Sequence, residues 1–218
     1  MGSALEVLRP ALREIMLRLT LDAPEAQIDA LLAYLSLLQR WNATYNLTAV
    51  REPAQMLTQH VADCLAVMTP LRRELGVGPS ALLDVGSGGG LPGVVVAILN
   101  PAIQVTCVDA VGKKAAFIRQ VAAELGLRNL RAEHSRVEQM TSGPFKLLIS
   151  RAFASLSDFV RMTRARLAPD GVWMAMKGKL PADELSQLPD SVDVFHVEPI
   201  AVPGLDAERC LVWMRPKR

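Results

Sequence analysis

The pattern of apolar and polar positions changes about a third of the way along the chain. Before residue 76, apolar residues recur at the spacing of an amphipathic helix. Between residues 26 and 41 these positions are Ile28, Leu31, Leu32, Leu35 and Leu38. A second apolar face runs from Met56 to Met68, after Pro53, a residue that suits the first turn of a helix. The first third of the chain is therefore predicted to be helical.

After a glycine-rich break at residues 76–80, short apolar runs of strand length alternate with helix-like stretches. The runs are 81–85, 103–108, 145–150 and 171–177, and the main helical stretches between them are 112–125 and 156–167. Such alternation indicates a parallel sheet covered on both faces. The last two runs, 192–197 and 209–214, have no helix between them and are expected to pair antiparallel at an edge.

These patterns predict a doubly wound, Rossmann-like α/β domain over residues 80–218 and an N-terminal helical cap over residues 1–79. Half of the 218 residues are hydrophobic, so a sizeable core is available. No apolar run approaches the roughly 20 residues that span a bilayer. Arginines interrupt the apolar positions of residues 1–19, unlike those of a signal peptide. A cytoplasmic protein without a membrane segment is expected.

Composition excludes some chemistry and leaves other chemistry open. The three cysteines and three histidines are scattered, so neither a disulfide framework nor a metal site is expected. A net charge of +2 neither requires nor excludes a nucleic-acid partner. Basic clusters such as Arg72-Arg73 and Lys113-Lys114 are equally well explained as solvated helix faces.

The most informative segment is the glycine-rich loop at residues 82–93, LLDVGSGGGLPG. A buried strand runs into a loop almost free of side chains, where a ligand can lie against the backbone. The spacing Gly88-x-Gly90-x-x-Gly93 fits a dinucleotide, with Asp109 where a ribose-binding acid is expected. Asp84, two residues before the first glycine, instead favours S-adenosylmethionine (SAM). Asp109 suits the ribose of either ligand and also suits a cap on the following helix.

The segment at residues 145–155, which contains the end of the strand that stands fourth in this type of fold, narrows the choice of reaction. It lacks the Asn/Asp-Pro-Pro-aromatic motif of exocyclic-amine methylation, and no cysteine has the context of cytosine-C5 chemistry. A guanine N7 has a free lone pair and no proton, so its methylation requires positioning and no general base. Arg151 could anchor a cofactor carboxylate or a phosphate, and Phe153 could stack on a base. An ordinary surface arginine and a core phenylalanine are the alternatives.

The order and spacing of several motifs resemble those of the RsmG/GidB family of bacterial 16S ribosomal-RNA (guanine-N7) methyltransferases, over about residues 30–215. These motifs are Trp41-Asn42-x-x-Tyr45-Asn46-Leu47-Thr48, His60-x-x-Asp63, the loop 84–93, Asp109-x-x-x-Lys113-Lys114, Ser135-Arg136-Val137-Glu138, Ser150-Arg151-Ala152-Phe153-Ala154 and Lys177-Gly178. The resemblance implies transfer of a methyl group from SAM to one guanine N7 near the decoding region. Small-subunit ribosomal RNA or the ribosomal subunit is then the partner, and a monomer without metal is expected.

The resemblance also implies the site residues. The residues at the family's cofactor positions are Gly86, Gly88, Leu91, Asp109, Val137, Glu138 and Arg151. Asp109 would bind the ribose, and Val137 and Glu138 would lie beside the adenine. Arg151 and Lys177 are the implied catalytic residues, with Lys177 facing the RNA or the transferred methyl.

The chain departs from the family pattern at Gln59, Cys64 and Gly89, where arginine, serine and proline are common. These departures put RNA contacts near Gln59 in doubt, but not cofactor binding. His60 lies on an apolar helix face one turn from Asp63, which suits buried hydrogen bonding better than RNA contact. Two rival functions remain at this point: a dehydrogenase that uses the same loop, for which no tyrosine–lysine pair is evident, and a catalytically idle RNA-binding protein.

Overall fold

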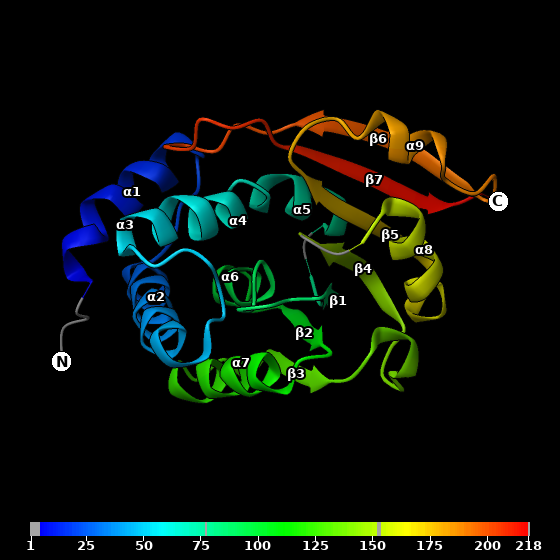
Figure 1. Cartoon of the computed structure of the whole chain (residues 1–218). Helices are drawn as coiled ribbons and strands as arrows, with labels where there is room; N and C mark the ends of the chain where they lie inside the picture. The colour runs from blue at the N-terminus through cyan, green and yellow to red at the C-terminus, as the bar shows by residue number, and fades with distance from the viewer. Residues whose placement is uncertain (1–4, 77, 152–153, 218) are drawn as a thin grey trace.

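The computed structural model in Figure 1 is organised around one mixed sheet, and it describes residues 5–76, 78–151 and 154–217. Within these residues the sheet has seven strands in the order β3-β2-β1-β4-β5-β7-β6. The strands are β1 Ser80–Val85, β2 Ile103–Asp109, β3 Leu130–His134, β4 Phe145–Ser150, β5 Leu167–Lys177, β6 Val192–Pro199 and β7 Cys210–Pro216. Strands β1 to β5 pair in parallel, and the predicted antiparallel edge pair is confirmed as β6 and β7.

Strand β3 was missed by the sequence pattern. It forms the edge of the sheet next to β2, and of its residues only Leu130 is buried. Its sequence, LRAEH, therefore lacks the continuous apolar run by which the inner strands were recognised.

The helices lie before and between the strands. Before the sheet come η1 Glu6–Leu8, α1 Arg9–Arg18, α2 Glu25–Tyr45, α3 Pro53–Met56, the π-helical η2 Leu57–Ala62, α4 Asp63–Leu65 and α5 Met68–Leu75. Along the sheet come α6 Gly93–Leu99, α7 Gly112–Glu124, η3 Val137–Gln139, α8 Leu156–Thr163, η4 Arg164–Arg166 and α9 Ala182–Ser186. The helical first third and the helix at Pro53 are thus as predicted. In the described chain no helix combines the length and apolar character needed to cross a membrane.

The two faces of the sheet are covered unequally. Figure 1 shows α2, α6 and α7 on one side of the sheet and α8 on the other. The first side holds the larger core cluster, in which Leu35 of α2 joins Val94 of α6 and Cys107 of β2. On the other side Phe159 of α8 packs with Leu83 and Trp173. Because the N-terminal helices share the larger core with the sheet, the division into two domains at residue 79 stays a prediction.

The strand directions bring distant segments together along the carboxyl ends of the parallel strands, which form one edge of the sheet. The parallel strands β1, β2, β4 and β5 all end at this edge. Strand β7 runs the opposite way, with Cys210 paired to Lys177, so β7 begins where β5 ends. The loops after β1, β2 and β4 therefore meet the end of β5 and the start of β7, where open α/β sheets bind ligands.

Candidate active site

The glycine-rich loop joins β1 to α6 and its backbone conformation requires glycine. Gly88 has φ +58, a left-handed conformation that other residues rarely adopt. Gly93 is required by close packing, since a Cβ atom there would lie 2.4 Å from the Cys107 sulfur and 2.8 Å from the Asp84 Oδ2. The loop therefore presents mainly backbone to a ligand.

Helix α2 holds this loop in place. The buried hydroxyl of Tyr34 donates a hydrogen bond of 2.7 Å to the carbonyl oxygen of Gly89. Leu38 packs beneath the same glycine, and its Cδ1 would lie 3.1 Å from a Cβ at that position. The sequence analysis missed Tyr34, because it occupies one position in a helix whose neighbours are apolar.

Asp84 is fully buried at the end of β1. Its Oδ2 accepts a hydrogen bond of 2.8 Å from the Gly93 amide, whereas no described residue donates to its Oδ1. Burial raises the pKa of the Asp84 carboxyl to about 7, against the lowering effects of the Gly93 amide and of Arg151. A cationic donor bound at this loop would supply the missing partner and favour the ionised form.

Asp109 ties the glycine loop to the next helix. Its Oδ2 accepts from the Gly88 amide at 3.0 Å, and its Oδ1 accepts from the Val111 amide at 2.8 Å, at the start of α7. Lys114 places its Nζ 3.7 Å from the same carboxylate. The N-cap of α7 is Val111, which has no side-chain capping bond, so the helix N-cap role considered for Asp109 is wrong. The ribose-binding role stays a prediction.

A first cavity of about 140 Å³ opens between the ends of β1 and β2 and the segment 135–138. It is lined by Val85, Gly86, Val108, Asp109, Ala110, Ser135, Arg136, Val137, Glu138 and Met162. Four of the predicted cofactor residues thus come together: Gly86, Asp109, Val137 and Glu138. Gly88 and Leu91 do not line this cavity. Gly88 donates its amide to Asp109, which does line it, and Leu91 is buried in the glycine-rich loop.

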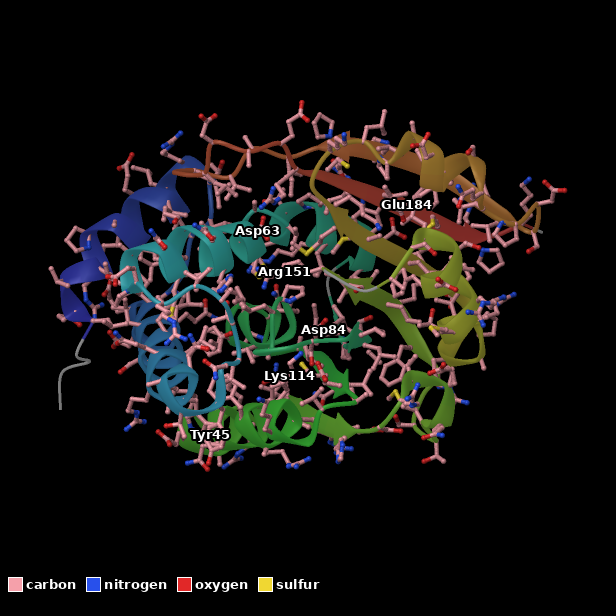
Figure 2. The ribbon with its side chains drawn as sticks, viewed as in Figure 1. Tyr45, Asp63, Asp84, Lys114, Arg151 and Glu184 are labelled. Atoms are coloured by element: carbon pink, nitrogen blue, oxygen red, sulfur yellow. The ribbon has the colours of Figure 1, made fainter. Side chains whose placement is uncertain are left out.

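A second cavity of about 360 Å³ lies beside the ends of β4 and β5. It is lined by Gln59, His60, Asp63, Arg151, Met176, Lys177, Gly178 and Arg209. The predicted residues Arg151 and Lys177 meet here. Figure 2 shows Arg151 between Asp63 and Asp84, across the middle of the molecule. The predicted site residues therefore divide between two cavities at the same edge of the sheet.

Asp63 connects two guanidinium groups in the second cavity. Its buried carboxylate accepts from the Arg209 Nε at 2.8 Å, and its other oxygen lies 3.5 Å from the Arg151 Nη1. The same Arg151 nitrogen lies 3.2 Å from the Gln59 carbonyl oxygen and 3.3 Å from the His60 Nδ1. His60 is buried and hydrogen bonded, as expected. The sequence analysis missed Arg209, which stands in none of the recognised motifs.

Lys177 is ion-paired at the rim of the second cavity. Its Nζ lies 2.9 and 2.8 Å from the two carboxylate oxygens of Glu184 in α9. Glu184 also accepts from the Leu156 amide at 2.7 Å, at the start of α8. The sequence analysis missed Glu184. Phe153, proposed to stack on a base, lies outside the described residues.

Comparisons with known proteins identify the class first. Ribosomal protein L11 methylase from Lactobacillus delbrueckii subsp. bulgaricus is 17% identical, with a TM-score of 0.56 over 71% of this chain and 78% of that chain. A SAM dependent methyltransferase from Aquifex aeolicus is 13% identical, with a TM-score of 0.54 over 73% of this chain and 92% of that chain. The fold is that of the Rossmann-like, class I SAM-dependent methyltransferases, as predicted.

The family follows from closer matches. A family model described as rRNA small subunit methyltransferase G matches residues 27–212. A protein of Leptothrix cholodnii named Ribosomal RNA small subunit methyltransferase G is 63% identical over 193 residues, 88% of each chain. This chain belongs to the GidB family of rRNA small subunit methyltransferases G. The family predicted from the motifs is confirmed, and the dehydrogenase alternative is not supported.

Proposed function

We propose that this protein transfers a methyl group from SAM to N7 of a guanine in small-subunit (16S) ribosomal RNA. The observation that carries the proposal, beside family membership, is the pair of cavities at one edge of the sheet. One is lined by four of the seven predicted cofactor residues, and the other gathers three cationic side chains, Arg151, Lys177 and Arg209. The first suits the cofactor and the second suits a polyanionic acceptor.

The residues of the loop and first cavity fit SAM. The unpartnered Oδ1 of Asp84 suits the cofactor's ammonium group, and Arg151 suits its carboxylate. Asp109 still has acceptor capacity for ribose hydroxyls, because a carboxylate has about four lone-pair sites. Val137 and Glu138 suit the adenine. Gly86, Gly88 and Leu91 complete the cofactor site in this proposal, which includes no metal ion.

When bound, SAM supplies an activated methyl group and leaves as S-adenosylhomocysteine. The protein's part is then to hold the guanine N7 in line with the transferred methyl and to exclude water. The titratable groups that line the second cavity suit this role. His60 and Asp63 both contact Arg151, and Asp63 also pairs with Arg209. We therefore assign these two residues to holding the arginines and not to removing a proton from the substrate. Transfer without a general base is therefore part of the proposal.

The second cavity is proposed to receive the acceptor nucleotide. Arg151 and Lys177 act there as catalytic residues, and Arg209 adds a guanidinium suited to a backbone phosphate. The Lys177–Glu184 pair means that an RNA phosphate has to compete with a carboxylate for this lysine. A monomer acting in the cytoplasm, on free RNA or on the ribosomal subunit, completes the proposal.

The test is methyl transfer from labelled SAM to small ribosomal subunits and to free ribosomal RNA, followed by location of the modified base. Label on a guanine N7 of the small-subunit RNA is the expected result. Label on another base would retain a methyltransferase and overturn the proposed acceptor. With SAM binding demonstrated by calorimetry but no label on either substrate, the proposed reaction would be wrong. The same assay ranks naked RNA against the subunit as substrate.

A further inference from the structure

The motif Trp41–Thr48, which the proposed cofactor and acceptor sites leave unexplained, ends beside the second cavity. Thr48 places its Oγ1 2.7 Å from the Nε2 of His60. The Nδ1 on the opposite side of the same imidazole lies 3.3 Å from the Arg151 Nη1. A chain of polar contacts thus joins the loop after α2 to the guanidinium at the end of β4.

The chemistry of the two contacts determines where the His60 proton lies. An arginine only donates hydrogen bonds, so the His60 Nδ1 must offer its lone pair to Arg151. The imidazole proton then resides on Nε2 and is donated to the Thr48 Oγ1. Arg151 therefore requires the Nε2-protonated tautomer, and the Thr48 hydroxyl oxygen stabilises it by accepting the Nε2 proton.

The loop after α2 is shaped to deliver this hydroxyl. Asn42 is buried, its Nδ2 donates to the Val50 carbonyl oxygen at 3.0 Å, and its Oδ1 accepts from the Thr48 amide at 2.8 Å. Helix α2 ends at Tyr45, and the φ of +50 at its C-cap, Asn46, turns the chain back. The Val50 amide donates to the Thr48 Oγ1 at 3.2 Å. These hydrogen bonds hold the backbone of Thr48 and of Val50 in place, and with it the Thr48 hydroxyl.

The charged groups around His60 favour the neutral form. Burial, and then the charge of Arg151 from β4, lowers the pKa of His60 to about 4, against the opposing effects of the Gln59 carbonyl and of Asp63 from α4. Lys177 from β5 and Arg209 from the start of β7 line the same cavity and add positive charge. A protonated imidazole at this place would lose its acceptor and repel Arg151.

We infer that His60 is a positioning residue for methyl transfer: the Thr48 hydroxyl accepts its Nε2 proton, and its Nδ1 lone pair orients the Arg151 guanidinium in the second cavity. The inference rests on the proposed function, because Arg151 is the group that is positioned. It gives the N-terminal motif a role in catalysis through Asn42 and Thr48. Neither residue lines the first or the second cavity.

The first test compares two threonine-to-valine variants that differ only in place. Thr48→Val removes the hydroxyl beside His60. Thr58→Val removes a half-buried hydroxyl that, among the described residues, donates to the Ala54 and Gln55 carbonyls of the preceding α3. Because misplacement of a catalytic group by about 1 Å can cost up to about a hundredfold, we expect kcat/KM to fall about tenfold or more in Thr48→Val. Thr58→Val should behave as wild type. Equal activity in the two variants would overturn the inference.

The second test uses rescue at His60. Leucine removes the acceptor, whereas the side-chain oxygen of glutamine can accept from Arg151. We expect His60→Leu to lose activity to the same degree as Thr48→Val and His60→Gln to recover most of it, with SAM-saturated kcat showing the difference. Full activity in His60→Leu, or an equal loss in both variants, would contradict a positioning role. Normal turnover in Arg151→Ala would instead contradict the proposed function.

A third measurement uses the wild-type protein, so it does not depend on whether a variant folds. The chain has three histidines, so nitrogen NMR of the labelled protein can resolve the His60 ring. At pH 6 we expect a neutral ring with its proton on Nε2, whereas an ordinary histidine, with pKa of about 6.5, is mostly protonated there. A proton on Nδ1, or a doubly protonated ring at pH 6, would overturn the inference.

Discussion

The two cavities at the carboxyl edge of the sheet are built in different ways. The first is lined mostly by the last residues of β1 and β2 and by the residues that follow β1, β2 and β3, together with Met162 of α8, and its surface is mainly apolar. The second takes side chains from η2, α4, β4, β5 and the residue before β7, and most of these side chains are polar or charged. Local sequence therefore encodes the proposed cofactor site, and long-range packing assembles the proposed acceptor site.

The contrast extends to how each cavity handles charge. In the first, Asp109 accepts hydrogen bonds from two backbone amides, that of Gly88 in the glycine loop and that of Val111, the residue before α7. In the second, the buried Asp63 holds Arg151 and Arg209, which follow it by 88 and 146 residues. A buried carboxylate that loses one such partner is left undercompensated, so this cavity is the more sensitive to single substitutions.

The largest expected effect is at Arg151, which adjoins both regions. Its charge acts on the carboxyl of Asp84 beside the glycine loop and on Asp63 in the second cavity. We expect Arg151→Ala to lower kcat/KM for methyl transfer at least about a hundredfold, because both ligands lose a common anchor. The assay is single-turnover methyl transfer to the small ribosomal subunit.

The control for this variant is an arginine of the same sheet that lies away from both cavities. Arg215 lies in β7 and pairs with Asp193 through its Nε at 2.8 Å, towards the opposite edge. Arg215→Ala should retain activity. Because Asp63 keeps Arg209 in Arg151→Ala, we expect that variant to remain folded, with its melting transition cooperative. Normal turnover in a folded Arg151→Ala would remove the link between the two cavities.

The next effect concerns Asp84 and separates stability from cofactor binding. The pKa of its carboxyl is raised to about 7, so the neutral form stabilises the fold at low pH, and this contribution is lost as pH rises through 7. For wild type we expect the free energy of unfolding to fall on the order of 3 kcal/mol between pH 5 and pH 8 from this group. Asp84→Asn should flatten this dependence and weaken SAM binding about tenfold or more.

Denaturant unfolding at several pH values and calorimetry of SAM binding test both parts. Glu74→Gln, in the last turn of α5, controls for the loss of one carboxylate. If Asp84→Asn binds SAM as tightly as wild type, the ammonium site proposed at Asp84 is wrong. An unchanged pH dependence in the variant would place the responsible group elsewhere.

A smaller effect is expected at Arg209, on the acceptor side alone. Arg209 directly precedes β7 and Arg215 lies near its end, and each pairs with an aspartate at 2.8 Å, so their glutamine variants remove the same charge at opposite ends of one strand. We expect Arg209→Gln to weaken RNA binding several-fold and to reduce the slope of log affinity against log salt by about 1. SAM affinity should be unchanged. Binding titrations at several salt concentrations distinguish the variants, and equal effects would argue against a phosphate contact at Arg209.

The smallest effect is expected at Glu184, the partner of Lys177. Glu184→Gln removes the competing charge while an amide oxygen remains to accept from the Leu156 amide. Because partly exposed ion pairs contribute about 0–1 kcal/mol, RNA binding should tighten by no more than about fivefold. Asp183→Asn, an exposed neighbour in the same helix, is the control. Weaker RNA binding in Glu184→Gln would mean that Glu184 positions Lys177 and does not compete for it.

Much of the architecture was determined by sequence pattern alone. Inner strands such as β1 and β4 are buried on both faces, so their sequences are continuous apolar runs. The glycine loop is recognisable in the sequence because a site lined by backbone tolerates few side chains. Asp109 was expected from its place at the end of β2, whereas Gly86, Val137 and Glu138 were implied by the family resemblance; all four line the first cavity.

Tertiary structure alone decided the rest. Tyr34 supports the loop, Glu184 pairs with Lys177 and Arg209 joins Asp63, and each contact depends on a residue that lies far along the chain or outside any motif. Hydrophobic periodicity reports local conformation and which face is buried. It carries no signal for an ion pair between residues 63 and 209, because such a pair exists only after the antiparallel strand β7 has brought its first residues to the end of β5.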